Sequence, residues 1–245
     1  MEKNYAFKNR IEEVTKLVSF VREKKNIELE ARLGFLKGRK FDANVKKNFF
    51  KSCLEMCESF EGWECVKNWH SRRDYFLKNN VRVSVFSEPV HHKVSLRKKK
   101  LKTLTFPIVS KDNKNRPNLP TTISGSRGDE EESPTALRVD ASVEDVVTGD
   151  IKDQVPHFVR YKVIKQFKTK SGWSFDFSKT FTDVDPQIVI DKSSMFTEDD
   201  SEDTASYELE IELENFTYIA KKSDLDVATS LLLKVFDFLP YDVFI

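Results

Sequence analysis

Apolar and polar residues alternate along much of this 245-residue chain, with the period of two that is typical of β-strands buried on one face. The alternation is clearest at 27–35, 80–85, 137–144, 158–163, 173–181 and 207–214. It is weaker at 63–69, at 73–77 and, in two pieces, at 90–106. Because helices do not alternate with these segments, the pattern predicts about eight to ten antiparallel strands rather than a parallel βαβ sheet.

Three other segments have apolar residues at helical spacing. The first covers roughly 5–25, the second begins near Asp42 and the third begins near Ser223. Asp42 and Ser223 are of the residue types that cap the first turn of a helix. The apolar positions that we expect the second and third helices to bury are Val45, Phe49, Cys53, Met56, Leu225, Leu232 and Phe236.

Two segments have the composition of solvated loops. Residues 107–134 hold four of the eight prolines and an acidic run, and residues 197–203 are rich in Ser, Asp and Glu. The strand pattern continues on both sides of each segment, so neither marks a domain boundary. We expect a single domain over residues 1–245, with a mobile loop at about 107–136 that is most simply a surface insertion.

Every second residue of the strand at 207–214 is a glutamate, and the strand at 27–33 repeats this pattern. Alternate residues of a strand share a face, so neighbouring carboxylates lie ~6.6 Å apart and repel by ~2.5 kcal/mol at an effective dielectric of 20. Two such strands could converge on Mg²⁺ or Mn²⁺, which prefer oxygen ligands. The charged residues on these two faces are Glu28, Glu30, Arg32, Glu208, Glu210, Glu212 and Glu214.

The polar faces of the other strands carry bases, acids and hydroxyls. One strand alone would fit an ordinary sheet with a charged outer face, but the complementary faces favour a closed barrel. Helices would cover its apolar outside, and its charged inside would suit a metal and a phosphate ligand. These polar faces comprise Asn80, Arg82, Ser84, Arg138, Asp140, Ser142, Glu144, Arg160, Lys162, Ser174, Asp176, Ser178 and Thr180.

Composition narrows the function classes further. The chain has 41 basic and 40 acidic residues, which leaves no overall polybasic character to attract nucleic acid. No apolar run approaches the ~20 residues of a membrane span, and the N-terminal residues do not resemble a signal peptide. The three cysteines, an odd number, indicate reduced thiols and an intracellular protein.

The order of these strand motifs resembles the triphosphate tunnel metalloenzymes. Within that superfamily it is most similar to the metal-dependent RNA 5′-triphosphatases that begin mRNA capping in fungi, protozoa and some DNA viruses. The resemblance covers roughly residues 27–216. It implies an α+β fold in which helices flank a closed antiparallel eight-stranded β-barrel, the triphosphate tunnel, with a charged interior.

The resemblance also implies roles for individual residues. Glu144 would orient or deprotonate the attacking water. The implied ligands of Mg²⁺ or Mn²⁺ are Glu28, Glu30, Glu208, Glu210 and Glu212. The implied phosphate-binding residues are Arg82, Lys98, Arg160 and Lys162, with Arg97 and Lys99 as alternatives to Lys98. Asp176 and Ser178 would support the tunnel.

The chain departs from the family pattern at two positions. Ile164 occupies the place of the third basic residue in an Arg-x-Lys-x-Arg strand, and the adjacent Lys165 should face outward. Ser174 occupies the place of an arginine before Asp176. One phosphate contact and one interior ion pair are therefore in doubt.

The activity implied is hydrolysis of the γ-phosphate of triphosphate-ended RNA to a diphosphate end, and also of NTPs with manganese. The alternatives are an inorganic tripolyphosphatase or adenylyl cyclase of the same superfamily, and a non-catalytic barrel that binds polyanions. The expected partners are the RNA 5′ end, NTP and a separate guanylyltransferase, because no Lys-x-Asp-Gly motif occurs in the chain. A homodimer is left open, and no membrane is expected. The location would be the nucleus for a cellular capping enzyme or the cytoplasm for a viral one.

Overall fold

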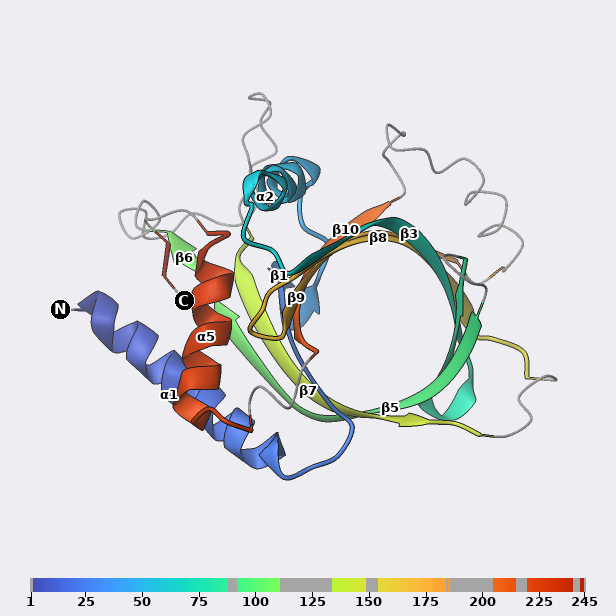
Figure 1. Ribbon diagram of the computed structural model, residues 1–245, viewed down its shortest axis with the longest axis horizontal. Coiled ribbons are helices and arrows are strands. Elements are labelled where there is room, and N and C mark those ends of the chain that lie inside the picture. The colour runs from blue at the N-terminus through green and yellow to red at the C-terminus, as the bar shows by residue number, and fades with distance from the viewer. Residues whose placement is uncertain are drawn as a thin grey trace.

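The chain forms a closed antiparallel barrel, and Figure 1 looks into it along its opening. The computed structural model describes residues 2–87, 92–110, 134–148, 154–183, 185, 205–214, 220–239 and 243–244. Eight strands follow one another in the order β10-β9-β8-β3-β4-β5-β7-β1, and pairing of β1 with β10 closes the ring. They are β1 (Ile27–Lys37), β3 (Cys65–Phe76), β4 (Val81–Phe86), β5 (His92–Pro107), β7 (Ala136–Val146), β8 (Phe158–Lys168), β9 (Trp173–Asp183) and β10 (Ser206–Leu213).

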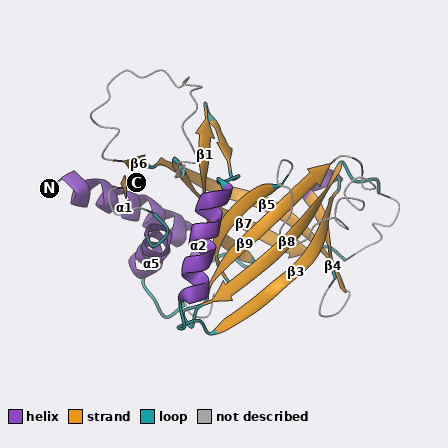
Figure 2. Ribbon diagram, turned by 90° about the horizontal axis from the view of Figure 1, so that it is seen from above, coloured by secondary structure: helices purple, strands orange, loops and turns teal. Residues whose placement is uncertain are grey.

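Three α-helices of the described residues lie outside the barrel: α1 (Glu2–Arg22), α2 (Lys47–Ser59) and α5 (Asp224–Phe236). Figure 2 shows α2 along the outer wall, with α1 and α5 crossing beside it. Short elements complete the fold: β2 (Lys40–Asp42) pairs with β1, β6 (Val109–Ser110) pairs with β11 (Val243–Phe244), and a 3₁₀ turn, η1 (Lys78–Asn80), precedes β4. The predicted fold class is thereby confirmed.

The main core lies between the helices and the outer face of the barrel, because the apolar residues of each strand point away from the interior. Leu29 of β1 and Leu209 of β10 are 1% exposed, and they belong to the same cluster as Leu17 of α1, Phe50 of α2 and Leu231 of α5. The barrel is thus built apolar outside and charged inside, as the strand patterns indicate.

The third helix begins where predicted, since Ser223 and Asp226 cap it reciprocally. The second does not begin near Asp42, which lies in β2. It begins at Lys47, after an N-cap residue, Lys46, whose side chain makes no capping bond. Two expected core residues are wrong, because Met56 is 42% exposed and Leu225 is 54% exposed.

The weak strand signals belong to two long strands. The segments at 63–69 and 73–77 form one strand, β3, whose pairing with β8 shifts between Lys67 and His70. The two pieces at 90–106 form β5, with a shift between Lys100 and Lys102. Irregular pairing breaks the period of two, which explains the weak pattern.

Much of the predicted loop at 107–136 and all of the segment at 197–203 lie outside the described residues. The single-domain assignment stays a prediction. No helix of the described residues has both the length and the apolar character that a membrane crossing requires.

Candidate active site in the barrel interior

All eight barrel strands contribute to a cavity of about 280 Å³ inside the barrel. Its lining is mostly charged. It includes Glu28, Arg82, Lys98, Glu144, Arg160, Lys162, Asp176, Ser178, Glu210 and Glu212 of the predicted site. Glu30 and Glu208 share the inward face but do not line this cavity.

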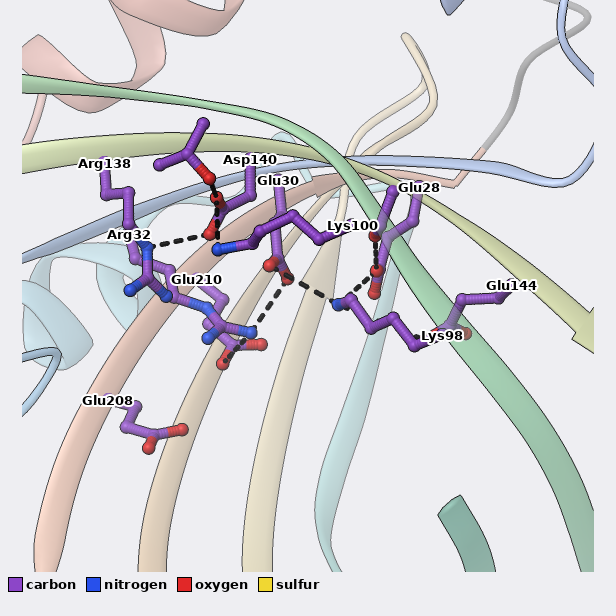
Figure 3. Close-up of polar contacts among 12 residues, drawn as sticks. Glu28, Glu30, Arg32, Lys98, Lys100, Arg138, Asp140, Glu144, Glu208 and Glu210 are labelled. Atoms are coloured by element: carbon purple, nitrogen blue, oxygen red, sulfur yellow. Dashed lines mark hydrogen bonds and ion pairs between the residues drawn. The ribbon is translucent and has the colours of Figure 1, made fainter. Parts of the chain in front are cut away.

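The two glutamate strands lie side by side. Arg32 of β1 is directly opposite Glu210 of β10, and Glu30 is directly opposite Glu212. Arg32 Nη2 is 2.8 Å from Glu30 Oε2 and 3.1 Å from Glu210 Oε1, so one guanidinium bridges the two strands. Figure 3 shows this bridge.

A second group joins β1 to the opposite side of the sheet. Lys98 of β5 forms an ion pair with Glu28, and its Nζ lies 3.5 Å from Glu30 Oε1 and 4.0 Å from Glu144 Oε1. Arg82 Nη2 is 3.2 Å from the same oxygen of Glu144. These contacts fix the inward register of Lys98, whereas Arg97 and Lys99 are exposed.

Lys162 forms a third group, nearly buried at 3% exposure. Its Nζ is 2.9 Å from Glu208 Oε2 and 3.4 Å from Glu210 Oε1. Glu208 lies two residues beyond Glu210 and opposite Ser178, and Figure 3 draws it apart from Glu28 and Glu30. Glu208 is therefore the predicted ligand least associated with the others.

The glutamates differ in protonation. Burial alone would raise the pKa of Glu210, but Arg32 and Lys162 hold it well below its usual range. Burial raises the pKa of Glu30 despite Arg32 and Lys98. Burial, with Glu28 and Asp176 nearby, raises the pKa of Glu212 well above its usual range.

Glu212 is the one predicted ligand that makes no ion pair or hydrogen bond among the described residues. Its neighbour on β9 is Ser174, the position where the family has an arginine. The Ser174 hydroxyl is fully buried and without a hydrogen-bond partner, so it does not replace that arginine. The doubtful interior ion pair is therefore missing from this barrel.

This arrangement fits a divalent cation. Glu212 faces Glu30 across the strands, and like charges directly opposite one another are destabilising unless a cation compensates them. Within the described part of the chain, no three acidic, His or Cys side chains already stand in metal-binding geometry. Arg32, Lys98 and Lys162 lie between the carboxylates, which is the arrangement that satisfies them without a metal.

Arg160 fits an anionic ligand. It lines the cavity, its Nε is buried without a hydrogen-bond partner, and it makes no ion pair among the described residues. Its contact is with an aromatic ring, since its guanidinium carbon lies 5.3 Å from the centre of Phe76. A phosphate oxygen would supply the missing acceptor.

Sequence reasoning missed two site residues, Arg72 and Asp74 of β3. Both line the cavity, Arg72 Nε is 3.0 Å from Asp74 Oδ1, and the Ser84 hydroxyl donates to that oxygen at 2.6 Å. Alternation could have found them, but two consecutive arginines, Arg72 and Arg73, concealed which one faces inward.

A third missed group lies farther along β7. Asp140 is 2% exposed and is held by Arg138 at 2.7 Å and Lys100 at 3.0 Å. Burial alone would raise its pKa, but bonds from Thr103 and Lys100 lower it. The Arg138–Asp140 alternation is visible in the sequence, but it carried no assigned role.

The second departure from the family pattern also has a structural outcome. Ile164 lines the cavity where a third basic residue was expected. Lys165 points outward, where it forms an ion pair with Glu58 of α2. No bulge turns Lys165 inward, because β8 keeps one register with β9 through Ile164 and Lys165.

We expect Asp176 to make stability depend on pH. Burial, with Glu210 and Glu214 nearby, raises its pKa to about 6, although Gln166 donates to it at 2.9 Å. The unfolded value is ~3.9, so the penalty for its charge is absent below about pH 4 and complete above about pH 6. In EDTA, Asp176→Asn should add on the order of 2 kcal/mol to the unfolding free energy at pH 7.5 and nothing at pH 3.5. Denaturant titration at both pH values would check this, and an equal effect at both would contradict it.

Known proteins with this fold act on RNA 5′ ends. No family model and no curated protein matches the chain. Among solved structures it is similar to the S. pombe RNA triphosphatase Pct1, at TM-score 0.64 and 14% identity over 94% of this chain and 92% of that one.

It is also similar to the RNA triphosphatase domain of a trifunctional mimivirus mRNA capping enzyme, at TM-score 0.58 and 15% identity over 94% and 96% of the two chains. Another similar structure is Pct1 in complex with the Spt5 CTD, at TM-score 0.64 and 14% identity over 93% and 91%. At this identity the likeness concerns the fold. The chain has the triphosphate tunnel fold of these RNA triphosphatases.

Proposed function

We propose that this protein is a metal-dependent RNA 5′-triphosphatase that removes the γ-phosphate from triphosphate-ended RNA. The observation that carries the proposal is the lining of the cavity, which combines an uncompensated glutamate, Glu212, with an arginine, Arg160, that lacks an anionic partner. A divalent cation and a phosphate would satisfy both. The likeness to Pct1 and to the mimivirus domain supports RNA as the substrate.

Mg²⁺ or Mn²⁺ would be held by Glu28, Glu30, Glu210 and Glu212, with Glu208 the least associated of the predicted ligands. When bound, the metal neutralises charge on the γ-phosphate oxygens. The chain itself supplies cations: Arg82, Lys98, Arg160 and Lys162 line the cavity and would bind phosphate oxygens. Asp176 and Ser178 support the wall.

Glu144 is the best-placed base for the attacking water. It lines the cavity beside Arg82 and Lys98, two candidate phosphate ligands. Burial and the charge of Glu28 raise its pKa, although Arg82 opposes this. A carboxylate with a raised pKa accepts a proton more readily near neutral pH.

We expect Glu144→Gln to reduce kcat about 10²–10⁴-fold, because general-base catalysis contributes about that factor. Its unfolding temperature should change by only a few degrees, since the glutamine keeps a carbonyl oxygen for Arg82. Steady-state kinetics with thermal unfolding would check this. Loss of the folded state in the variant would show that Glu144 has a structural role instead.

Product analysis tests the proposed reaction against its alternatives. The protein would be incubated with Mg²⁺ or Mn²⁺ and triphosphate-ended RNA, ATP or tripolyphosphate. A diphosphate RNA end and free phosphate are expected, with ADP from ATP in Mn²⁺. Cleavage of tripolyphosphate alone would indicate a tripolyphosphatase, cyclic AMP would indicate a cyclase, and binding without products would indicate a polyanion-binding barrel.

The remaining assignments belong to the same proposal. We infer one domain over residues 1–245 that acts before a separate guanylyltransferase, in the nucleus of a cell or in the cytoplasm for a virus. Homodimerisation stays a prediction. Pct1 has been solved with the Spt5 CTD, which makes a peptide partner reasonable to test.

A further inference from the structure

Two aromatic rings are stacked at the rim of the barrel, on the face that elsewhere carries mostly charged side chains. Phe86 is the last residue of β4 and His92 is the first of β5. The two residues are directly opposite one another. Their ring centres are 4.3 Å apart and their planes differ by 3°. Both line the cavity, so this flat surface belongs to the candidate active site.

The aromatic pair continues a row of cations. Lys162 of β8 is opposite Arg72 of β3, and Arg72 is opposite Phe86. The Arg72 guanidinium carbon lies 5.6 Å from the centre of the Phe86 ring. With strands about 4.8 Å apart, the row passes from Lys162 to Phe86 over about 10 Å. One end of the row would bind phosphate, and the other end presents planar rings.

A nucleotide with a 5′-triphosphate has the same distribution of chemistry, with charge at one end and a flat base at the other. We propose that Phe86 and His92, with Arg72 beside them, form a stacking site for the base of the first nucleotide. This inference rests on the proposed function and extends it to the orientation of the substrate. Stacking uses the π-face that all bases share, so the site would accept any first base.

A second stacked pair in the same barrel provides a comparison. Phe76 and Phe158 are opposite one another on β3 and β8, with ring centres 4.3 Å apart and planes 17° apart. Arg160 lies over Phe76 as Arg72 lies over Phe86. Neither Phe76 nor Phe158 lines the cavity. Cross-strand aromatic pairs stabilise sheets wherever they occur, but only Phe86 and His92 adjoin the cavity.

The test compares substrates with and without a base. In Phe86→Ala, the KM for triphosphate-ended RNA and for ATP should rise roughly tenfold, equivalent to about 1.4 kcal/mol and within the range of base–aromatic stacking. The KM for tripolyphosphate should change less than twofold. Phe86→Trp should restore the values for RNA and ATP. Phe158→Ala, the matched control, should leave the ratio of the KM values for ATP and tripolyphosphate within twofold.

An equal change for all three substrates, or no change for any, would overturn the stacking site while leaving the triphosphatase assignment in place. Absence of turnover by the wild type would instead contradict the proposed function. Calorimetric titration with ATP and with tripolyphosphate in EDTA needs no turnover and separates the two cases. Selective loss of ATP affinity in Phe86→Ala supports stacking, and equal affinities of wild type and variant for ATP overturn it.

Discussion

Replacement of Glu212 by glutamine is expected to stabilise the metal-free protein and to reduce metal-dependent phosphate release at least 100-fold. Stabilisation is expected because Glu212 faces Glu30, lies opposite the neutral Ser174, and has no cationic partner among the described residues. Its pKa is raised well above the usual range, so its charge costs stability above that pKa and the cost disappears as the pH falls below it. Glutamine removes the charge at almost the same volume. Activity should fall because a neutral amide is a weaker ligand for Mg²⁺ or Mn²⁺.

Thermal unfolding in EDTA at pH 7.5 should show a rise of about 2–4 °C, which corresponds to roughly 1 kcal/mol for a protein of this size. Glu208→Gln is the matched control, because Glu208 lies on the same face but pairs with Lys162 at 2.9 Å. That variant should unfold at a lower temperature than the wild type. A lower unfolding temperature for Glu212→Gln, or full activity with metal, would contradict the account of Glu212.

Lys162→Met is expected to cause the largest loss of stability. Lys162 is 3% exposed and compensates Glu208 and Glu210 together. Removing one partner of a buried ion pair leaves an uncompensated charge and costs about 3–5 kcal/mol, or roughly 10–15 °C here. Phosphate release should fall as well, because Lys162 is a candidate phosphate ligand.

Lys165→Met provides the control for Lys162→Met. Lys165 is three residues along the same strand, and its ion pair with Glu58 lies on the outer surface. Surface ion pairs contribute about 0–1 kcal/mol, so this variant should unfold close to the wild type. Equal stability of the two variants in denaturant titrations would show that Lys162 does not compensate the interior carboxylates.

The barrel could be predicted because its polarity is written into the alternation of its strands. Leu209, Ile211 and Leu213 alternate with glutamates, and the structure buries all three against the helices. The pattern failed where the pairing is irregular, as at Lys67–His70 of β3, and where elements are short, as in β2. Such features depend on partner strands that the local sequence does not reveal.

The site was predictable by face but not by pairing. Alternation places Glu30 and Arg32 on one face, but only the register of β1 with β10 shows that Arg32 meets Glu210 and Glu30 meets Glu212. The consequence of Ser174 also needed the register, because Ser174 matters through the residue opposite it. The row through Phe86 depends on three strand pairings, which no single strand could indicate.

The central claim is tested most directly by release of the γ-phosphate from γ-labelled triphosphate-ended RNA, with Mg²⁺, with Mn²⁺ and with EDTA. The account predicts release with either metal, none with EDTA, and a diphosphate end on the RNA. It also predicts loss of release in Glu210→Ala that is shown to be folded. No release from folded wild-type protein with either metal would contradict the account and would favour a barrel that only binds polyanions.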